Sequence, residues 1–573
     1  MNLFLIDAIG PFFRGYKRST INWSKIPWDH IRLDESPEHH RQFEQIRKDF
    51  TDFCDRVGNL GYNAISLDDL AHLADHEYYE PEIREKIRIC GEEFRKLFTI
   101  AHDRDLKIFI TLDVISYTPQ LRKHVGSGGK DVRKFLGNLI GSFFNDFPEV
   151  SGLITRIGES DGKDVRGDFK SELHLRTPGK VRRFLEHLLP ICEARGKKLI
   201  FRTWTVGAYH IGDLIWHRSR FKRVFKGLKS DALIISMKYG ESDFFRYLPL
   251  NANFFRSDHA KIVELQARRE YEGCGEYPAY IGTDTEEFAS ALKGARNMVG
   301  MSVWCQTGGW VPFRRLAFLE EGNGHWTEIN CSVAIRIFKH GESAQEALKH
   351  HAKKGNISSQ EALTELMDLS EEAICNLLYA KEFASQKLFF RRVRIPPLLG
   401  VYWNNIFINH STRKLARHFI LDTEVAIKQT KDVLESFYRM KELAEQCGFP
   451  SEDIEFMQDT FQLLALAREY CLLPFSDEIR KRIKEHKRAY KKRWPKRQRY
   501  RIKVDYSPLR VRRKHLSWLF DLAFRKRRGY RIVDHLFTLH LLGFAYRMIV
   551  KRKPNIVPKF ARESAMGIDV VFK

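Results

Sequence analysis

Eight short apolar segments recur through the first 310 residues, and amphipathic stretches separate most of them. The segments cover Leu3–Ile9, Tyr62–Leu67, Leu106–Val114, Gly152–Ile157, Lys198–Thr205, Ala232–Met237, Ile262–Gln266 and Met298–Trp304. Between them, residues 43–60, 83–101, 132–147 and 180–195 carry apolar side chains at the i, i+3, i+4 spacing of a helix. Strands and helices that alternate in this way are typical of a (β/α)8 barrel. A doubly wound open sheet is disfavoured because no glycine-rich turn follows the first strand.

At 573 residues the chain is long enough for more than one domain. We predict an α/β fold in which residues 1–315 form the TIM barrel. From 316 to 475 the periodicity becomes helical, which predicts an all-α domain packed on the barrel. Residues 476–573 form the third predicted unit, a strongly basic helical tail.

The tail holds most of the net charge. The whole chain has 97 Lys+Arg and 73 Asp+Glu, for a net charge of +24. Residues 476–573 contain 30 Lys+Arg and 8 Asp+Glu, so 30 − 8 = +22 of that charge lies there. The remainder of the chain is almost neutral.

Several partners fit this basic segment. Apolar stretches such as His535–Val550, flanked by Lys/Arg clusters, are typical of helices that lie on an anionic membrane surface. Binding to nucleic acid is the less favoured alternative. The segment could also bind a polyanionic glycan, or it could be a solvated helical appendage. Membrane flotation with and without 476–573 would separate these alternatives.

Other features of the sequence indicate a cytoplasmic protein, with peripheral attachment to the inner face of the membrane as an extension of the tail argument. The N-terminal segment lacks the basic start and cleavage site of a signal peptide. Nine cysteines at irregular spacing are typical of free thiols in a reducing compartment. No Cys/His group has the spacing of a zinc site, so we expect neither a metal nor another cofactor.

Catalytic residues of a barrel enzyme lie where its strands end, so we inspected those ends. Strands four to eight end in carboxylates, basic residues and tryptophans: Glu159, Arg202, Trp204, Lys238, Glu241, Asp243, Glu264, Arg269, Glu270, Glu272, Trp304, Gln306 and Trp310. Two carboxylates across a barrel mouth can act as acid and base on a glycosidic bond, and tryptophan faces suit sugar rings. Any one of these carboxylates could instead form a structural salt bridge, and Arg202 and Lys238 could be its partners.

Three of these strand ends resemble motifs of glycoside hydrolase family 67, the α-glucuronidases. The segments are GLITRIGESDG, KYGESDFF and VELQARREYEG. The resemblance implies that Glu159 is the general acid and that Asp243 and Glu270 are the carboxylates that activate water. It also implies that Arg202 and Lys238 bind the carboxylate of a uronic acid.

The segment GNGHWTEIN, which contains Trp326, resembles the family's stretch leading into its helical C-terminal domain. A strand-four lysine of the family falls on Thr155, so its contact with the substrate is missing or is made by Arg156. We expect Trp204, Trp304, Trp310 and Trp326 to contact sugar.

The sequence therefore predicts a glycoside hydrolase that cleaves an acidic glycan by an inverting, two-carboxylate mechanism. Such a mechanism places the two carboxyl groups about 6.5–9.5 Å apart, to leave room for the attacking water. The alternative is a carbohydrate-binding or scaffold barrel that has the cleft but no turnover. The sugar, its linkage and the oligomeric state are not encoded in any of these motifs.

Overall fold

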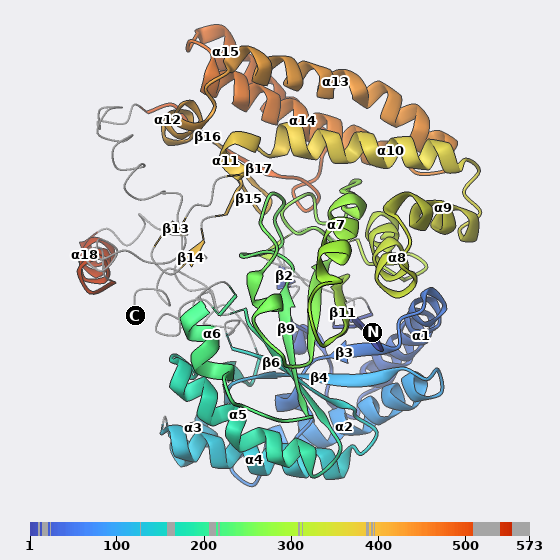
Figure 1. Ribbon diagram of the computed structural model, residues 1–573, viewed down its shortest axis with the longest axis vertical. Coiled ribbons are helices and arrows are strands. Elements are labelled where there is room, and N and C mark those ends of the chain that lie inside the picture. Colours follow the sequence, from blue (N-terminus) through green and yellow to red (C-terminus); the bar gives the residue numbers. More distant parts are fainter. Residues whose placement is uncertain are drawn as a thin grey trace.

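The computed structural model has a barrel at one end and a layer of helices at the other (Figure 1). It describes the following residues: 1–9, 12–13, 21–22, 25–126, 128–157, 167–204, 214–215, 218–306, 310–311, 313, 315–385, 389–390, 393–394, 396–507 and 539–552. Within these residues, no helix combines the length and the apolar character needed to span a bilayer.

The barrel is closed by eight parallel strands, as the sequence predicts. Going round it, each strand pairs with its neighbours in chain order and the last pairs with the first. The strands are β1 (Leu3–Asp7), β3 (Ala64–Leu67), β4 (Lys107–Asp113), β6 (Gly152–Arg156), β8 (Lys198–Arg202), β9 (Leu233–Lys238), β10 (Lys261–Gln266) and β11 (Met298–Trp304). Each of the eight predicted apolar segments thus coincides with one barrel strand, although β9 and β10 each extend one residue beyond the predicted segment.

Helices cover the outside of the barrel because each carries an apolar stripe that must be buried. They are α1 (Pro37–Leu60), α2 (Pro81–His102), α3 (Pro119–Val125), α4 (Gly129–Asp146), α5 (Pro178–Glu193), α6 (Arg218–Phe225), α7 (Gly282–Leu292) and α8 (His325–His340). Several begin at a side-chain cap, as in α1, where Ser36 accepts a hydrogen bond from the His39 amide.

The barrel interior is layered along its axis. An apolar cluster fills one layer and consists of Leu3, Leu5, Ala64, Phe109, Ile154, Ile200, Ile234 and Ile262. Side chains two residues apart on a strand point to the same face. The positions two and four residues beyond this cluster therefore also face inward, towards the carboxyl ends of the strands.

The second region is mainly helical. It contains α9 (Ala344–Lys354), α10 (Gln360–Ala373), a π-helical turn η4 (Ile374–Leu378), α11 (Lys381–Ala384), α12 (His410–Phe419), α13 (Thr423–Gln446), α14 (Ser451–Leu472) and α15 (Asp477–Arg493). Helices α10, α13 and α14 lie side by side at the top of Figure 1, farthest from the lower part of the barrel. This agrees with the predicted helical domain.

The region also contains strands that the helical periodicity does not predict. β15 (Val401–Tyr402) and β16 (Asn405–Asn409) form a hairpin, and β17 (Arg501–Asp505) pairs in parallel with β16. β17 comes from the segment that the sequence assigned to a helical tail. Its five residues are too few, and their charges too many, for a clear strand signal.

The start of the basic segment is packed into this helical region. In α15, Tyr490 lies within hydrogen-bond distance (3.0 Å) of the Thr460 hydroxyl on α14, and just beyond it Trp494 donates to Asp459 at 2.8 Å. Ile479 and Ile483 are buried on the same helix. Residues 477–505 therefore pack with the helices before them, whereas the sequence predicts a basic tail that begins at 476. The apolar face of α15 consists of few residues, and the many lysines and arginines around them make it hard to recognise in the sequence.

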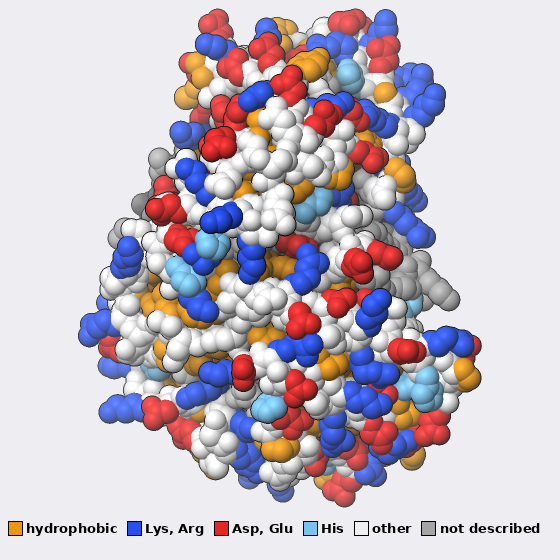
Figure 2. All heavy atoms as spheres, turned by 90° about the vertical axis from the view of Figure 1, so that its right-hand side faces the viewer, with side chains coloured by type: hydrophobic (Ala, Val, Ile, Leu, Met, Phe, Trp, Pro, Cys, Tyr) orange, Lys and Arg blue, Asp and Glu red, His pale blue; other side chains and the backbone are white. Residues whose placement is uncertain are grey.

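On the face of the molecule that Figure 2 presents, neither positively nor negatively charged side chains predominate. Lys/Arg and Asp/Glu side chains intermingle over both the upper and the lower part of the molecule. This agrees with the nearly neutral charge of the chain outside its basic segment.

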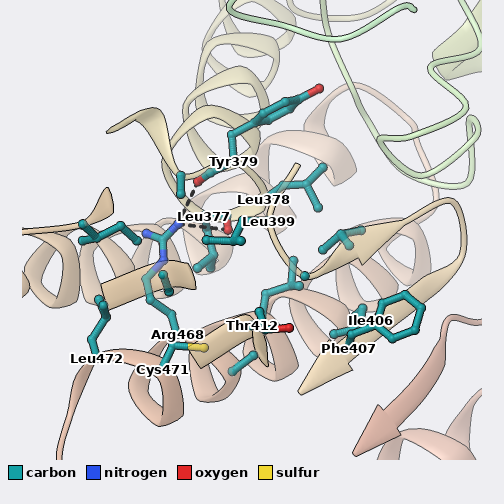
Figure 3. Close-up of a pocket in the computed structure, with 17 residues that line it drawn as sticks. Leu377, Leu378, Tyr379, Leu399, Ile406, Phe407, Thr412, Arg468, Cys471 and Leu472 are labelled. Carbon is teal, nitrogen blue, oxygen red and sulfur yellow. Dashed lines mark hydrogen bonds between the residues drawn. The ribbon is translucent and has the colours of Figure 1, made fainter. Parts of the chain in front are cut away.

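A small cavity of about 50 Å³ lies beneath the β15–β16 hairpin, between α12 and α14 (Figure 3). Its lining is apolar except for Arg468 on α14 and a few polar groups. The guanidinium donates to the carbonyl oxygens of Leu377 and Tyr379 at 3.1 and 2.8 Å, and also to that of Asn376. Arg468 thereby satisfies carbonyl groups that the π-helical turn leaves without intrahelical partners.

We predict that Arg468→Met lowers the free energy of unfolding by about 2–4 kcal/mol, because several buried carbonyl groups lose their donor. Urea denaturation followed by circular dichroism measures this. Arg439→Met is the matched control: Arg439 forms an exposed ion pair with Glu365 on the same bundle, and its loss should leave stability unchanged. Equal effects of the two substitutions would contradict this role of Arg468.

Candidate functional site

Charged side chains fill the inward positions at the carboxyl ends of the barrel strands. They follow the apolar layer by two or four residues and are buried: Asp7, Asp68, Asp113, Arg156, Arg202, Lys238 and Glu264, with Gln266 and Trp304 beside them. Buried charges must be paired to be tolerated. The ion pairs divide the residues other than Asp7 into two groups, one on β8–β11 and one on β3–β6, whereas Asp7 on β1 accepts hydrogen bonds from the Cys305 and Gln306 amides.

The first group is built around Glu264 on β10. Arg202 of β8 donates to both of its carboxylate oxygens, with Nε–Oε1 at 3.0 Å and Nη2–Oε2 at 2.9 Å. Trp304 Nε1 donates to Oε2 at 3.2 Å, and the Arg202 guanidinium lies 4.6 Å from the Trp304 ring centroid. Burial alone raises the pKa of Glu264, but Arg202 and then Lys238 outweigh it, so that this pKa lies below its usual value.

Lys238 and Asp243 form the second ion pair of this group. Lys238 is the last residue of β9, and its ammonium contacts the Asp243 carboxylate. The ammonium also lies 3.6 Å from the ring centroid of Trp204, a cation–π contact. Tyr271 Oη donates to the other carboxylate oxygen of Asp243 at 2.8 Å. Both predicted basic residues are thus in ion pairs, as the structural alternative anticipated.

Glu270 lies in the loop after β10, next to Tyr271, which donates to Asp243. Gln266 Nε2 donates to the Glu270 carboxylate at 3.2 Å, and the backbone amide of Glu270 donates to Gln266 Oε1 at 2.9 Å. Burial, followed by the charges of Asp243 and Glu270, raises the pKa of both the Tyr271 and the Tyr402 phenol. The charges of both carboxylates therefore act on the same pair of phenols.

The structure brings together six of the nine predicted site residues: Arg202, Trp204, Lys238, Asp243, Glu270 and Trp304. Glu159 lies outside the described residues. Only the backbone of Trp310 is described, where β12 (Trp310–Val311) pairs with β2 (Ile21–Asn22).

Trp326 lies elsewhere. It is on α8, where its indole nitrogen donates to Asp453 of α14 at 2.8 Å and its ring packs on Phe449 at 4.7 Å. These contacts join the barrel to the helical region and give Trp326 a packing role at that junction.

Sequence reasoning missed the second charged group, on β3–β6. Arg156 pairs with Asp113 at 2.8 Å and with Asp68 at 3.1 Å. Lys25 contacts Asp113 and lies 3.4 Å from Asp69, whose other oxygen is 2.6 Å from His72 Nδ1. Arg156, which the departure at Thr155 suggested as a substrate contact, is thus already paired with two carboxylates. The signal for this group was the two-residue alternation of β3 and β4, which places Asp68 and Asp113 inside the barrel.

A third buried network connects the site loops to the helical region. Arg246, in the loop that carries Asp243, donates to Glu272 at 3.2 Å, in the loop that carries Glu270. Tyr379, next to the π-helical turn, donates to the other oxygen of Glu272 at 2.7 Å, and Arg246 also pairs with Glu371 of α10. The positions of both candidate carboxylates thus depend on contacts with the helical region.

The described residues contain no group of three His, Cys, Asp or Glu side chains placed to hold a metal ion. The chemistry that this arrangement offers is proton transfer between carboxyl groups and hydroxyl groups, next to aromatic faces and buried positive charge.

Among known proteins, this chain is similar in fold to solved structures. No protein-family model matches the sequence, and no curated protein matches it. A solved GH138 enzyme targeting pectin rhamnogalacturonan II is similar over 97% of this chain and 68% of its own, with a TM-score of 0.53 and 13% identity.

Two further structures match less well. An O-GlcNAc hydrolase mutant of Thermobaculum terrenum matches over 77% of this chain and 85% of its own, with a TM-score of 0.40 and 11% identity. An endocellulase of Pyrococcus horikoshii matches over 58% and 93%, with a TM-score of 0.33 and 13% identity. The similarity to the GH138 enzyme, at 13% identity, shows a shared fold alone.

We predict that Glu264→Gln destabilises the protein by about 3–5 kcal/mol at pH 7, because Arg202 keeps its buried charge without its partner. The folded pKa of Glu264 lies below the unfolded value near 4.5. Its contribution to stability is therefore complete above pH 4.5 and is lost as the pH falls through the folded pKa. Urea titrations of both proteins between pH 3 and 7 should show the difference shrinking at low pH; a constant difference would contradict the assignment.

Proposed function

We propose that this protein is a glycoside hydrolase that cleaves an acidic glycan at the carboxyl end of its barrel. The observation that carries the proposal is a buried cluster in which Tyr271, the residue after Glu270, donates to Asp243 at 2.8 Å, while Gln266 donates to Glu270 at 3.2 Å. Buried carboxyl groups that can hold and deprotonate a water molecule supply the base of the two-carboxylate cleavage of a glycosidic bond. The barrel similarity to solved glycoside hydrolases supports the proposal at the level of fold.

In this proposal Asp243 and Glu270 hold and deprotonate the attacking water. Glu159, by its resemblance to the strand-four motif of the α-glucuronidases, protonates the leaving oxygen. Tyr271 donates to one oxygen of Asp243 at 2.8 Å and Lys238 contacts the other, so the carboxylate is held in a fixed orientation for the attacking water. Opposite-face attack by this water gives inversion at the anomeric carbon.

The substrate class follows from the charges beside these carboxylates. Lys238 has three N–H donors and uses its contact with Asp243 for one of them, so it can also bind a carboxylate of the substrate. Arg202, although it holds Glu264, adds a second positive charge to the same wall. Trp204 and Trp304 supply flat faces for sugar rings. Uronic acids combine these features, and the similar GH138 enzyme targets a pectin.

One observation favours a second candidate, a carbohydrate-binding barrel without turnover. Arg202 and Lys238 are neutralised by the protein's own carboxylates, as in a purely structural network. In that case Asp243 would be a partner for Lys238 and would not act on water. The two candidates differ in whether substitution of Asp243 abolishes cleavage or only weakens binding.

We predict that Asp243→Asn and Glu270→Gln each lower kcat on a cognate uronic-acid glycoside by about 10²–10⁴-fold, because each removes a base from the water-activating pair. Glu159→Gln should have a similar effect that shrinks on substrates with an activated aryl leaving group. A panel of uronic-acid glycosides provides the assay, and NMR of the first-formed anomer reports inversion.

The matched control is Glu93→Gln. Glu93 is equally buried but lies on α2, where it pairs with Arg47 outside the barrel. Activity of this variant should equal that of the wild type. Cleavage at the wild-type rate by Asp243→Asn and Glu270→Gln together would eliminate the proposed mechanism, and glycan binding without any cleavage would favour the binding barrel.

We further propose that the basic segment holds the enzyme at the anionic inner face of a membrane. In α18 (Leu539–Arg552) the large apolar side chains Phe544 and Met548 are 61% and 44% exposed. Arg547 and Lys551 are exposed on the same side of the helix, at the i, i+3, i+4, i+7 spacing. Exposed apolar groups among bases fit the interface of an anionic bilayer.

We predict that the double substitution Phe544→Ser/Met548→Ser reduces flotation with phosphatidylserine vesicles several-fold, because each substitution removes apolar area that would be buried in the membrane interface. Flotation of the wild type should weaken with added salt. The matched control is Leu421→Ser, a change at an 84% exposed leucine of the helical region. Salt-dependent binding to DNA without binding to vesicles would reverse the assignment in favour of nucleic acid.

A further inference from the structure

The turn between β15 and β16 extends from the helical region to the candidate site. It consists of Tyr402, Trp403, Asn404 and Asn405, and the two strands on either side of it pair as a hairpin. The Asn404 carbonyl accepts a hydrogen bond from the Arg501 amide at 2.7 Å, at the start of β17. The turn is therefore held from behind by a third strand.

Tyr402 places this turn beside the carboxylates. Its ring centroid is 6.4 Å from that of Tyr271, and Tyr271 donates to Asp243 at 2.8 Å. The charges of Asp243 and Glu270 also act on the Tyr402 phenol. The Tyr402 ring remains 38% exposed, so one part of it is available to a ligand.

The turn contains a concentration of polar atoms that lack partners. Among the described residues, Trp403 Nε1, Asn404 Nδ2 and Asn405 Oδ1 are buried and form no hydrogen bond. Asn404 and Asn405 are only 4% and 6% exposed. Buried polar atoms are nearly always satisfied in folded proteins, and each one that is not destabilises the fold. Three in consecutive residues indicate groups held ready for an external partner.

The backbone of the turn supports the same conclusion. Trp403 has φ +47°, in the left-handed region that a bulky side chain rarely adopts. Its ring packs on that of Tyr402, with centroids 4.6 Å apart. Strained residues of this kind persist where the surrounding structure forces them, and they cluster at ligand-binding sites.

We propose that Tyr402, Trp403, Asn404 and Asn405 form a sugar-binding subsite that the helical region contributes to the barrel. The ligand is a neighbouring sugar unit of the glycan whose bond the barrel cleaves, so this inference rests on the proposed function. Two N–H donors and one carbonyl acceptor match sugar hydroxyl groups, which both accept and donate hydrogen bonds. The adjacent aromatic pair matches the apolar face of a sugar ring.

Two substitutions test the subsite with little change of volume. Trp403→Phe keeps an aromatic ring and removes the indole N–H. Asn404→Ala removes the unpartnered Nδ2 donor, together with the Oδ1 that accepts from Asn405 Nδ2, and keeps the backbone carbonyl that bonds to Arg501. We expect each to raise KM about 10-fold or more for acidic oligosaccharides released from pectin rhamnogalacturonan II. Values of kcat/KM for an aryl glycoside of a single uronic acid should stay unchanged, because such a substrate does not reach the subsite. Asn145→Ala, at an exposed asparagine of α4, is the matched control.

Calorimetric binding of the same oligosaccharides separates this inference from the proposed function. If the wild type cleaves them and both variants cleave them equally well, the subsite is overturned and the hydrolase stands. If the wild type binds without cleaving and the variants bind more weakly, the subsite stands and the hydrolase is overturned. If the wild type neither binds nor cleaves them, both are overturned. Thermal unfolding of the variants confirms that the turn still folds.

Discussion

Charge buried inside the barrel is the constraint on which the rest of this structure depends. The inward positions near the strand ends carry arginine, lysine, aspartate and glutamate, and such groups are tolerated there only in pairs. Glu264 shows the principle: burial alone would favour its neutral form, but the bidentate contact with Arg202 keeps it ionised. The same pairing restricts how the loops beyond the strands can be placed.

The helical region is part of this arrangement. Glu272 lies in the same loop as Glu270, and it is held by Arg246 from the neighbouring loop and by Tyr379 from the helical region. A barrel without these helices would leave Arg246 and Glu272 with fewer partners and would lack Tyr402 beside the carboxylates. The candidate site is thus a joint product of the two regions, although every candidate catalytic residue comes from the barrel.

Much of the fold could be predicted from the sequence, because the strands of a barrel repeat a local pattern. The eight apolar segments correspond one to one with the barrel strands, and strand ends led to Arg202, Lys238, Asp243 and Glu270. Tyr402 could not be found in this way, since it reaches the site through packing between segments far apart in the chain. β17 was missed for a related reason: a short strand is defined by its partner, and the partner of Arg501 is Asn405. Asp68 and Asp113 also stand at strand ends, but the candidates predicted from the sequence come only from the ends of strands four to eight.

The pairing of β16 with β17 also has a consequence for synthesis of the chain. Protein chains emerge from the ribosome N-terminus first, and domains fold as they become available. All eight barrel strands have been made once Trp304 has appeared, whereas the support behind the 402–405 turn arrives only with Arg501–Asp505. A nascent chain can therefore close its barrel long before the turn is locked, and the edge of β16 stays open in the interval. Any C-terminal truncation before residue 505 would make that open edge permanent.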